Sequence, residues 1–528
     1  MPSPAAPAAP ARSSAGRPPA ASPEQATALR QALLGASYDA AGVQQRLGLA
    51  AAAALERGEH VPALLATRSG DALDTLIRLF LLGRAVPTTE ARRVLPAVPG
   101  LLLPAGADRV RASVGVCPYA QGWYVVSDHR PVRRPMHPDH VVGVGSASLT
   151  LVAATLRGQV ESALDLGTGC GVQALHLAAH SERVTATDTN RRALALAALS
   201  FALSEACVEL LAGDLWEPVA GRRFDLVVSN PPFVVGPARL TYRDSGLPGD
   251  EVSRRAVADA ADHLNDGGLA QVLTSWLHRP GEDWQDRVAA WLPPGCDALV
   301  LQREVLDPPA HVALWLDDEG LVDEGLDEQE LDEQELDDEG LDTDGRPVDR
   351  QTLAERREGY EQRYAAWLED LAAQRAEAIG FGMVVLRRTG GSPTVRMVDA
   401  RDWADPMTEA RVHGWLARVD QLRGGDGAGF EHARLRRAPG LVMHQALVPG
   451  GEDGWRQQSV RLSVPDGLPQ DVAVDDVLAQ VVSAVDAGLP LAVLAELVVA
   501  ATGELQAADR LVPAVRALVE AGHLLVDG

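Results

Sequence analysis

Short hydrophobic runs alternate with helical repeats along the middle of the chain, from Arg130 to Trp315. Runs rich in β-branched residues are typical of buried strands, and apolar residues spaced three and four apart are typical of helices. Such alternation predicts an α/β fold, with helices on both faces of a mostly parallel sheet. The predicted elements, in order, are a strand at Ala163–Leu166, a helix from Val172, a strand at Val184–Thr187, a helix from Arg191, a strand at Leu226–Ser229, a helix from Asp250 and strands at Ala270–Thr274 and Ala298–Val305.

Helical patterns precede this core. We predict a mainly helical region from Glu24 to Leu103, followed by strands at Val110–Val116 and Trp123–Val126. Gly83 and Pro87 end the clearest helical repeat of this region. The residues of that repeat are Leu73, Leu76, Ile77, Phe80 and Leu81.

The pattern of apolar residues near the end of the chain predicts three helices and a short strand. These elements resemble a winged-helix unit. Residues 485–528 carry six acidic side chains and two arginines. That balance would repel nucleic-acid phosphates, so protein interaction or plain packing is favoured over DNA binding. The predicted elements are helices at Val474–Asp486, Leu489–Ala501 and Ala508–Ala521 and a strand at His523–Val526.

Charge is unevenly spread over the 528 residues. All 48 basic residues are arginine, and 73 acidic residues give a net charge of −25. Residues 317–345 hold 9 Asp and 7 Glu without any Arg, and their leucines recur every five residues, a period that fits neither helix nor strand. We predict a disordered insertion here, with an acidic docking arm as the alternative. The rest of the chain is only mildly acidic, which argues against wholesale wrapping of nucleic acid but permits a local basic groove.

These patterns predict the domain organisation. A helix at Tyr360–Ala378 and a strand at Gly382–Arg387 would complete the core after the insertion. No apolar run approaches the ~20 residues that span a bilayer, and we expect a cytoplasmic protein without a membrane span. The predicted parts are a disordered Pro/Ala-rich tail at 1–24, a helical domain at 25–128, the core at 129–316, the acidic insertion at 317–350, the last helix and strand of the core at 351–392, and a C-terminal domain at 393–528.

The first chemical signal is a glycine-rich turn between a predicted strand and a helix. It reads Asp165-Leu166-Gly167-Thr168-Gly169-Cys170-Gly171. Glycines let the backbone turn sharply and approach a ligand closely. The GxGxG spacing differs from the GxGxxG dinucleotide fingerprint, so an NAD-dependent reductase is disfavoured.

Further polar residues follow the next predicted strands. Asp188 closes the second strand, where a carboxylate can accept hydrogen bonds from both ribose hydroxyls. Asp214 and Leu215 follow the third strand position, suited to an adenine edge. Because open α/β sheets bind ligands at the carboxyl ends of their strands, the three sites together favour a nucleotide-like cofactor over isolated helix caps.

The second signal is Asn230-Pro231-Pro232-Phe233, directly after the strand that ends at Ser229. Two consecutive prolines cannot continue a sheet ladder, so the strand must stop in a stiff corner. The Asn230 side-chain oxygen and the Pro231 carbonyl could hold both hydrogens of a planar NH₂ group, and Phe233 could stack on it. Such a corner suits methylation of an amide or aryl amine. A plain β-turn is the alternative.

Together these residues resemble the class I S-adenosylmethionine-dependent methyltransferases, specifically the branch that has an NPP[Y/F] motif and methylates nitrogen. The resemblance implies a Rossmann-like core, with Asp165, Gly167, Gly169 and Gly171 beside the methionine part of S-adenosylmethionine, Asp188 at its ribose, and Asp214 and Leu215 at its adenine. It also implies that Asn230, Pro231 and Phe233 hold the acceptor.

Downstream sequence narrows the resemblance to the release-factor glutamine methyltransferases. The segments concerned are Tyr242–Asp250, Arg254-Arg255 and Leu264–Gly268. The leading prediction is therefore methylation of a protein glutamine amide, with a release-factor-like partner. Methylation of an exocyclic amine of adenine or guanine in RNA or DNA is the alternative, and a noncatalytic scaffold is an alternative of another class. We predict no metal site, because His137 and His140 lack further ligands at suitable spacing, and the oligomeric state stays open.

Overall fold

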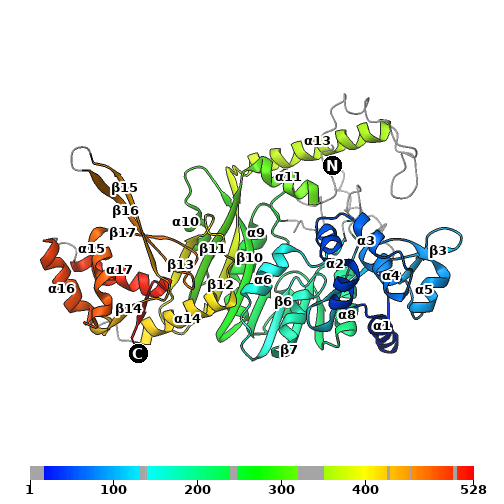
Figure 1. Cartoon of the computed structure of the whole chain (residues 1–528), viewed down its shortest axis with the longest axis horizontal. Coiled ribbons are helices and arrows are strands. Elements are labelled where there is room, and N and C mark those ends of the chain that lie inside the picture. The colour runs from blue at the N-terminus through cyan, green and yellow to red at the C-terminus, as the bar shows by residue number, and fades with distance from the viewer. Residues whose placement is uncertain are drawn as a thin grey trace, which may run out of the picture. The chain divides into compact units, whose positions relative to one another are not determined.

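The computed structural model describes residues 17–129, 137, 139–237, 247–318, 350–424, 429–450, 454–503 and 508–527 (Figure 1). Most of the predicted acidic insertion and of the predicted tail lies outside these residues. Two compact units form: Met1–Leu149, Gln159–Pro294 and Val305–Phe381 make unit 1, and Thr150–Gly158, Gly295–Glu304 and Gly382–Gly528 make unit 2. The predicted domain boundaries stay predictions.

Unit 1 begins with the predicted helices. The first starts inside the stretch predicted as tail, because Ser22 caps it and Gln25 completes a capping box. The π-helical turn η1 (Ile77–Leu81) extends the fourth helix along the predicted apolar face, and Gly83, with φ of 61°, ends it. The helices are α1 (Pro23–Gly35), α2 (Ala40–Glu56), α3 (Val61–Ala66), α4 (Ala72–Leu76) and α5 (Thr88–Val94).

Two small antiparallel sheets follow. Their strands are β1 (Val86–Pro87), β2 (Leu102–Pro104), β3 (Arg109–Ala112), β4 (Gly115–Tyr119) and β5 (Trp123–Ser127). The single strand predicted at Val110–Val116 is wrong. The chain bends at Ser113, whose N–H donates to the Leu101 carbonyl at 2.9 Å. As a result β3 pairs with β1 and β2, whereas β4 pairs with β5.

The α/β core confirms the predicted alternation. Its elements are α6 (Ser146–Ala154), β6 (Val160–Leu166), α7 (Val172–Ala178), β7 (Ser181–Asp188), α8 (Arg191–Ser204), β8 (Val208–Ala212), β9 (Phe224–Ser229), α9 (Glu251–Ala258), β10 (Leu264–His278), α10 (Trp284–Ala289), β11 (Cys296–Leu306), α11 (Pro308–Asp318), α13 (Arg350–Ala373), β12 (Ala378–Arg388) and β13 (Val395–Asp399). The strand order is β13-β11-β12-β10-β9-β6-β7-β8. Pairing is parallel from β10 through β9, β6 and β7 to β8.

The register of these strands aligns the predicted site segments. Leu166, the last residue of β6, is paired with Thr187 of β7 on one side and with Ser229 of β9 on the other. The glycine turn, Asp188 and the Asn-Pro-Pro corner therefore leave the sheet at one edge, at adjacent carboxyl ends.

Unit 2 contains the C-terminal helices and two further small sheets. The predicted helices and the last strand are confirmed, whereas the winged-helix assignment stays a prediction. The long β15–β16 ribbon is visible in Figure 1. The elements are α14 (Glu409–Gly424), β14 (Leu435–Arg437), β15 (Val442–Pro449), β16 (Trp455–Ser463), β17 (Val472–Val474), α15 (Asp476–Ala484), α16 (Leu491–Thr502), α17 (Ala508–Ala521) and β18 (Leu524–Val526).

Within the described ranges, every helix is too short or too polar to cross a bilayer.

Candidate active site

The chain turns between β6 and α7 at three glycines. Gly167, Gly169 and Gly171 have φ values of 80°, 54° and 89°, in the region that favours glycine. A Cβ atom on Gly171 would lie 2.7 Å from the ring of Phe201, whereas one on Gly169 would meet no atom within 4 Å. Gly171 is therefore required for packing against α8, and Gly169 leaves open space beside the turn.

Asp165 holds this turn from inside the fold. Its side chain is buried, and its Oδ2 accepts hydrogen bonds from Thr168 Oγ1 at 2.6 Å and from the Ala174 N–H at 3.0 Å. The other oxygen, Oδ1, is buried without a hydrogen-bond partner among the described residues. Burial, opposed by those two hydrogen bonds and assisted by the charge of Asp188, raises the pKa of Asp165 to about 7.

This raised pKa predicts a pH dependence of stability. Folded Asp165 keeps its proton until about pH 7, whereas the unfolded side chain loses it near pH 3.9. Its contribution to folding stability is therefore full below pH 3.9 and falls by about 4 kcal/mol as pH rises to 7. Asp165→Asn should gain stability relative to the wild type across this range, measured by urea unfolding at pH 5, 6, 7 and 8. Parallel pH profiles would contradict the assignment.

Asp188 ends β7 directly beside the turn. Its Oδ2 accepts from the Gly169 N–H at 2.9 Å, and its Oδ1 accepts from the Asn190 N–H at 2.7 Å. Burial raises the pKa of Asp188, and these backbone hydrogen bonds act in the opposite direction. Each carboxylate oxygen has a second lone pair, so it can still accept a hydrogen bond from a ligand hydroxyl group.

Asp214 and Leu215 follow β8 next to Asp188. The Gly213 N–H donates to the Asp188 carbonyl at 3.2 Å, which ties the two strand ends together. Asp214 is exposed, and Leu215 has φ of 43°, a left-handed conformation that is uncommon for residues other than glycine. Such strain is concentrated at functional sites.

The Asn-Pro-Pro corner adjoins the glycine turn. The Cα atom of Pro231 lies 3.9 Å from the position that a Cβ on Gly167 would occupy. Below the corner, Ser229 Oγ donates to the Leu166 carbonyl at 2.8 Å and joins the ends of β9 and β6. The structure thus brings together the two motifs that are more than sixty residues apart in the sequence.

Asn230 is half-buried and is oriented by α6. Its Nδ2 donates to Ser148 Oγ at 3.4 Å, and Gln173 Nε2 donates to the Ser148 carbonyl at 2.9 Å. None of the described residues donates a hydrogen bond to Asn230 Oδ1. The carboxamide therefore has a fixed donor side and an acceptor oxygen open to a ligand.

Phe233 packs within an aromatic cluster. Its ring lies edge-to-face against Trp315 at 6.5 Å and Phe381 at 6.2 Å between centroids. Ser275 Oγ on β10 donates to the Phe233 carbonyl, which fixes the backbone. Phe233 remains partly exposed, so its ring is held and still reaches the surface of the corner.

Sequence reasoning missed Ser148, Gln173, Trp315 and Phe381. Ser148 lies in α6, the first helix of the core, and the two aromatic residues come from segments far downstream. None belongs to a recognisable motif, and only the fold places them at the corner.

The other predicted segments have structural roles where they are described. Asp250 is buried and accepts hydrogen bonds from Arg287 Nε at 2.7 Å, from Arg287 Nη2 at 2.8 Å and from the Leu277 N–H at 2.9 Å. Tyr242–Gly246 of the same segment lies outside the described residues. His137 Nδ1 contacts Asp139 Oδ1 at 3.0 Å, and among the residues that the structure describes no three potential metal ligands cluster together.

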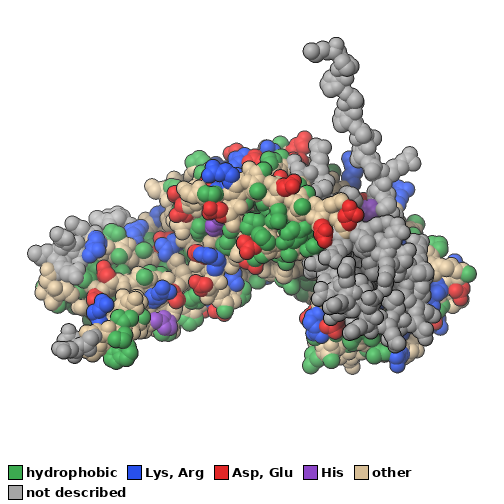
Figure 2. Space-filling view, turned by 90° about the horizontal axis from the view of Figure 1, so that it is seen from above, with side chains coloured by type: hydrophobic (Ala, Val, Ile, Leu, Met, Phe, Trp, Pro, Cys, Tyr) green, Lys and Arg blue, Asp and Glu red, His purple; other side chains and the backbone are tan. Residues whose placement is uncertain are grey.

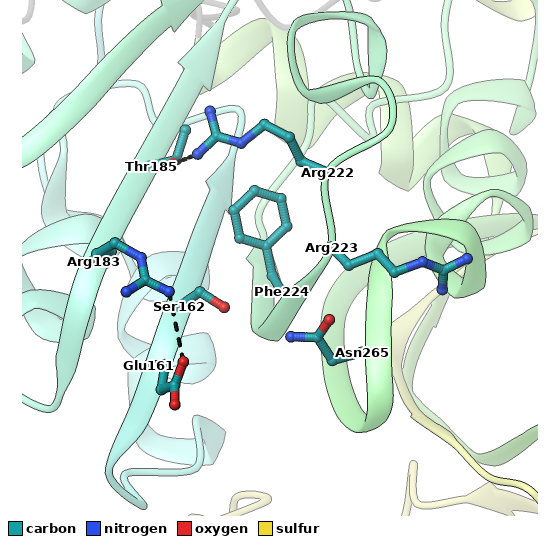
Figure 3. Close-up of a pocket in the computed structure, with 8 residues that line it drawn as sticks. All are labelled: Glu161, Ser162, Arg183, Thr185, Arg222, Arg223, Phe224 and Asn265. Atoms are coloured by element: carbon teal, nitrogen blue, oxygen red, sulfur yellow. Dashed lines mark hydrogen bonds and ion pairs between the residues drawn. The ribbon is translucent and has the colours of Figure 1, made fainter.

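A cavity of about 330 Å³ lies at the opposite edge of the sheet, at the amino ends of β6, β7 and β9 (Figure 3). Three arginines line it, but Arg183 is paired with Glu161 at 3.7 Å and Arg222 with Glu209 at 2.9 Å. Arg223 donates to the Leu264 carbonyl at 2.8 Å. None of the predicted site residues lines this cavity, so it is separate from the candidate active site.

The residues at the carboxyl edge fit S-adenosylmethionine, the cofactor that the resemblance implies. Gly169 leaves space where a side chain would stand, and Asp165 holds a buried oxygen without a described partner. Asp188 offers a carboxylate at the end of the neighbouring strand, where a ribose can bind. These features agree with a small polar ligand lying across the turn.

Comparisons with known families agree with this geometry. The model described as "Methyltransferase small domain" matches residues 141–278. Two further models, described as "Domain of unknown function (DUF7059)" and "Domain of unknown function (DUF7782)", match residues 35–113 and 413–526. The methyltransferase match covers the glycine turn and the Asn-Pro-Pro corner, whereas the descriptions of the two flanking models name no activity.

Individual relatives extend the match. A release factor glutamine methyltransferase of Deinococcus radiodurans is 31% identical over 246 residues, covering 40% of this chain and 88% of that protein. A ribosomal RNA small subunit methyltransferase C of Alcanivorax borkumensis is 30% identical over 129 residues, covering 24% of this chain and 36% of that protein. The solved T. thermophilus 16S rRNA N2 G1207 methyltransferase, in complex with AdoMet and guanosine, shares 20% identity and covers 42% of this chain and 55% of that one, with a TM-score of only 0.24. The glycine turn and the parallel sheet agree with the match to the first of these relatives. The chain therefore belongs to the class I S-adenosylmethionine-dependent methyltransferases and is an enzyme.

Proposed function

We propose that the enzyme methylates a planar nitrogen held at the Asn-Pro-Pro corner, and that its acceptor is a protein glutamine amide. The observation that carries the proposal is the proximity of the two motifs: Pro231 Cα lies 3.9 Å from the place that a Cβ atom on Gly167 would occupy. A ligand lying along the glycine turn would therefore reach the corner directly. S-adenosylmethionine supplies, when bound, a methyl group on a positively charged sulfur.

The residues of the chain would bind the cofactor and orient the acceptor. Asp165 and the three turn glycines would hold the methionine part of the cofactor, Asp188 its ribose, and Asp214 with Leu215 its adenine. At the corner, Asn230 Oδ1 and the Pro231 carbonyl would accept the two N–H hydrogens of the acceptor, so that its lone pair faces the turn. Phe233 would cover the flat face of the acceptor. No strong general base is needed, since the proton leaves after the nitrogen has become positively charged.

Three observations support a protein acceptor over a nucleobase. The release factor glutamine methyltransferase of Deinococcus radiodurans is matched over 88% of its length, whereas the ribosomal RNA methyltransferase is matched over 36%. The chain has a net charge of −25. Figure 2 shows basic and acidic side chains interspersed over the face in view, a distribution that differs from the clustered cations of RNA-binding surfaces. Because release factors act on ribosomes, the proposal also implies a cytoplasmic location.

The test is methyl transfer from tritiated S-adenosylmethionine to two purified acceptors, a release factor and small-subunit ribosomal RNA. We expect label on the release factor, lost when its glutamines are replaced. Label on the RNA alone, removed by nuclease and resistant to protease, would replace the proposal with nucleobase methylation. Label on neither would overturn both acceptors.

Replacing Asp188 with alanine tests the cofactor assignment. The variant should bind S-adenosylmethionine more weakly by about 1.5 to 3 kcal/mol, the usual contribution of hydrogen bonds to a charged group. Isothermal titration calorimetry measures the change in Kd. Glu209→Ala is the matched control, because Glu209 is an exposed carboxylate that pairs with Arg222 at the other edge of the sheet. An unaltered Kd for Asp188→Ala would remove the residue from the cofactor site.

A further inference from the structure

We infer that His311 is a positioning residue for the acceptor corner, acting through the backbone of Val235 and the ring of Trp315. The inference rests on the proposed function of the corner and adds to it a residue some eighty positions downstream.

His311 lies on α11 and its side chain is fully buried. Its Nε2 is 2.7 Å from the Val235 carbonyl oxygen, and its Nδ1 is 3.2 Å from Trp315 Nε1. An indole N–H can only donate, so Nδ1 must carry the lone pair and Nε2 the proton. The tautomer is therefore set by the two partners, and the imidazole links Trp315 to Val235.

Val235 is a point where the corner needs external support. Residues 230–235 form no helix or strand, and the two prolines have no N–H to donate. The carbonyl of Phe233 accepts from Ser275 Oγ, and that of Val235 accepts from His311 Nε2. Donors on β10 and α11 thus hold alternate carbonyls of the segment that presents Phe233.

The same imidazole lies in the aromatic cluster that contacts Phe233. His311 stacks on Phe381 at 5.7 Å with an interplanar angle of 21°, and it lies 6.0 Å from Trp367. Phe381 and Trp315 are the two rings that contact Phe233 edge-to-face. Loss of the His311 hydrogen bonds would therefore free both the backbone and the aromatic support of Phe233.

The ring is neutral at physiological pH. Burial lowers the pKa of His311 to about 4, opposed by the hydrogen bond to Val235. A proton on Nδ1 would also face the Trp315 N–H, where two donors cannot bond. The role is accordingly one of orientation, without proton transfer.

The test compares His311→Phe, which keeps a ring but loses both hydrogen bonds, with His311→Gln, which can donate through Nε2 and accept through Oε1. The assay uses tritiated S-adenosylmethionine and whichever acceptor, release factor or ribosomal RNA, receives the label. We expect His311→Phe to lower kcat by about tenfold and to leave the Kd of S-adenosylmethionine unchanged, since only the orientation of the acceptor is lost. His311→Gln should restore most of the rate. Equal losses in both variants, or full activity of His311→Phe, would overturn the inference.

His523→Phe is the matched control. His523 is also fully buried and bonds a carbonyl, that of Leu462 at 3.2 Å, but it belongs to unit 2. The His523→Phe variant should leave kcat unchanged. A loss of kcat equal to that of His311→Phe would instead indicate a general effect of replacing a buried histidine with phenylalanine. Should His311→Phe fail to fold, ¹⁵N signals of the wild-type imidazole decide: an Nε2-protonated neutral ring supports the inference, and any other form overturns it.

Asn230→Ala, assayed in parallel, separates the two proposals. If Asn230→Ala is inactive and His311→Phe is fully active, only the role of His311 fails. If Asn230→Ala is fully active, the proposed function of the corner fails, and the inference fails with it.

Discussion

Asn230→Ala is expected to lower kcat by about a hundredfold to a thousandfold, or about 2.7 to 4 kcal/mol, as removal of an oxyanion-hole donor does in other enzymes. The reason is that the Asn230 oxygen would hold the acceptor most strongly as positive charge develops on its nitrogen. The Kd of S-adenosylmethionine should change little, because the Asn230 side chain is hydrogen-bonded to Ser148 on α6 and, among the described residues, to none of those assigned to the cofactor. Single-turnover transfer and calorimetry measure the two effects.

Asn265→Ala is the matched control for this experiment. Asn265 lies at the amino end of the core strand β10 and also donates from Nδ2, to Asp225 Oδ1 at 2.7 Å, but it lines the cavity at the opposite edge of the sheet. It should leave kcat unchanged. Retention of most turnover in Asn230→Ala, or an equal loss in Asn265→Ala, would contradict the assigned role of the corner.

The sequence predicted the central α/β core and its two motifs because both depend on local chemistry. Glycines at 167, 169 and 171 are needed where φ is positive, and consecutive prolines after Ser229 must end a strand. Register then follows from parallel pairing of β6 with β7 and β9. Local rules were therefore enough to place Asp188 and Asn230 at one edge.

The supporting residues could not be predicted because they depend on contacts between distant segments. Ser148 reaches Asn230 across eighty-two positions, and His311 reaches Val235 across seventy-six. A lone serine in a helix and a lone histidine in a helix have many ordinary interpretations. Only the packing of α6 and α11 on the core distinguishes them.

The strands β15 and β16 of unit 2 were missed for a related reason. The β15–β16 ribbon is exposed on both faces over most of its length, with Trp455 70% exposed and Leu447 51% exposed. A strand without a buried face does not show the apolar and polar alternation that predicts strands. Backbone pairing alone defines this element.

Unit 2 contains a buried carboxylate that pairs with two arginines. Asp297 on β11 is fully buried and receives hydrogen bonds from Arg387 Nη2 at 2.8 Å, from Arg423 Nη1 at 3.1 Å and from the Thr394 N–H at 2.8 Å. Burial alone would raise the pKa of Asp297, but the hydrogen bonds from Arg423, Thr394 and Arg387 outweigh it and lower the pKa. The carboxylate thus joins β11, β12 and α14.

Asp297→Asn should destabilise the protein by about 3 to 5 kcal/mol, because it leaves two partly buried guanidinium groups without their shared countercharge. Asp420→Asn is the control: Asp420 also pairs with Arg387, but it is 58% exposed, and its loss should cost under about 1 kcal/mol. Since the folded pKa of Asp297 is lowered, its stabilisation is complete above the unfolded pKa near 3.9 and is lost as pH falls through the folded value. Urea unfolding should therefore show the full difference between wild type and Asp297→Asn at pH 7 and a smaller one below about pH 4. A difference that does not change with pH would mean that packing, and not the ion pairs, makes Asp297 necessary.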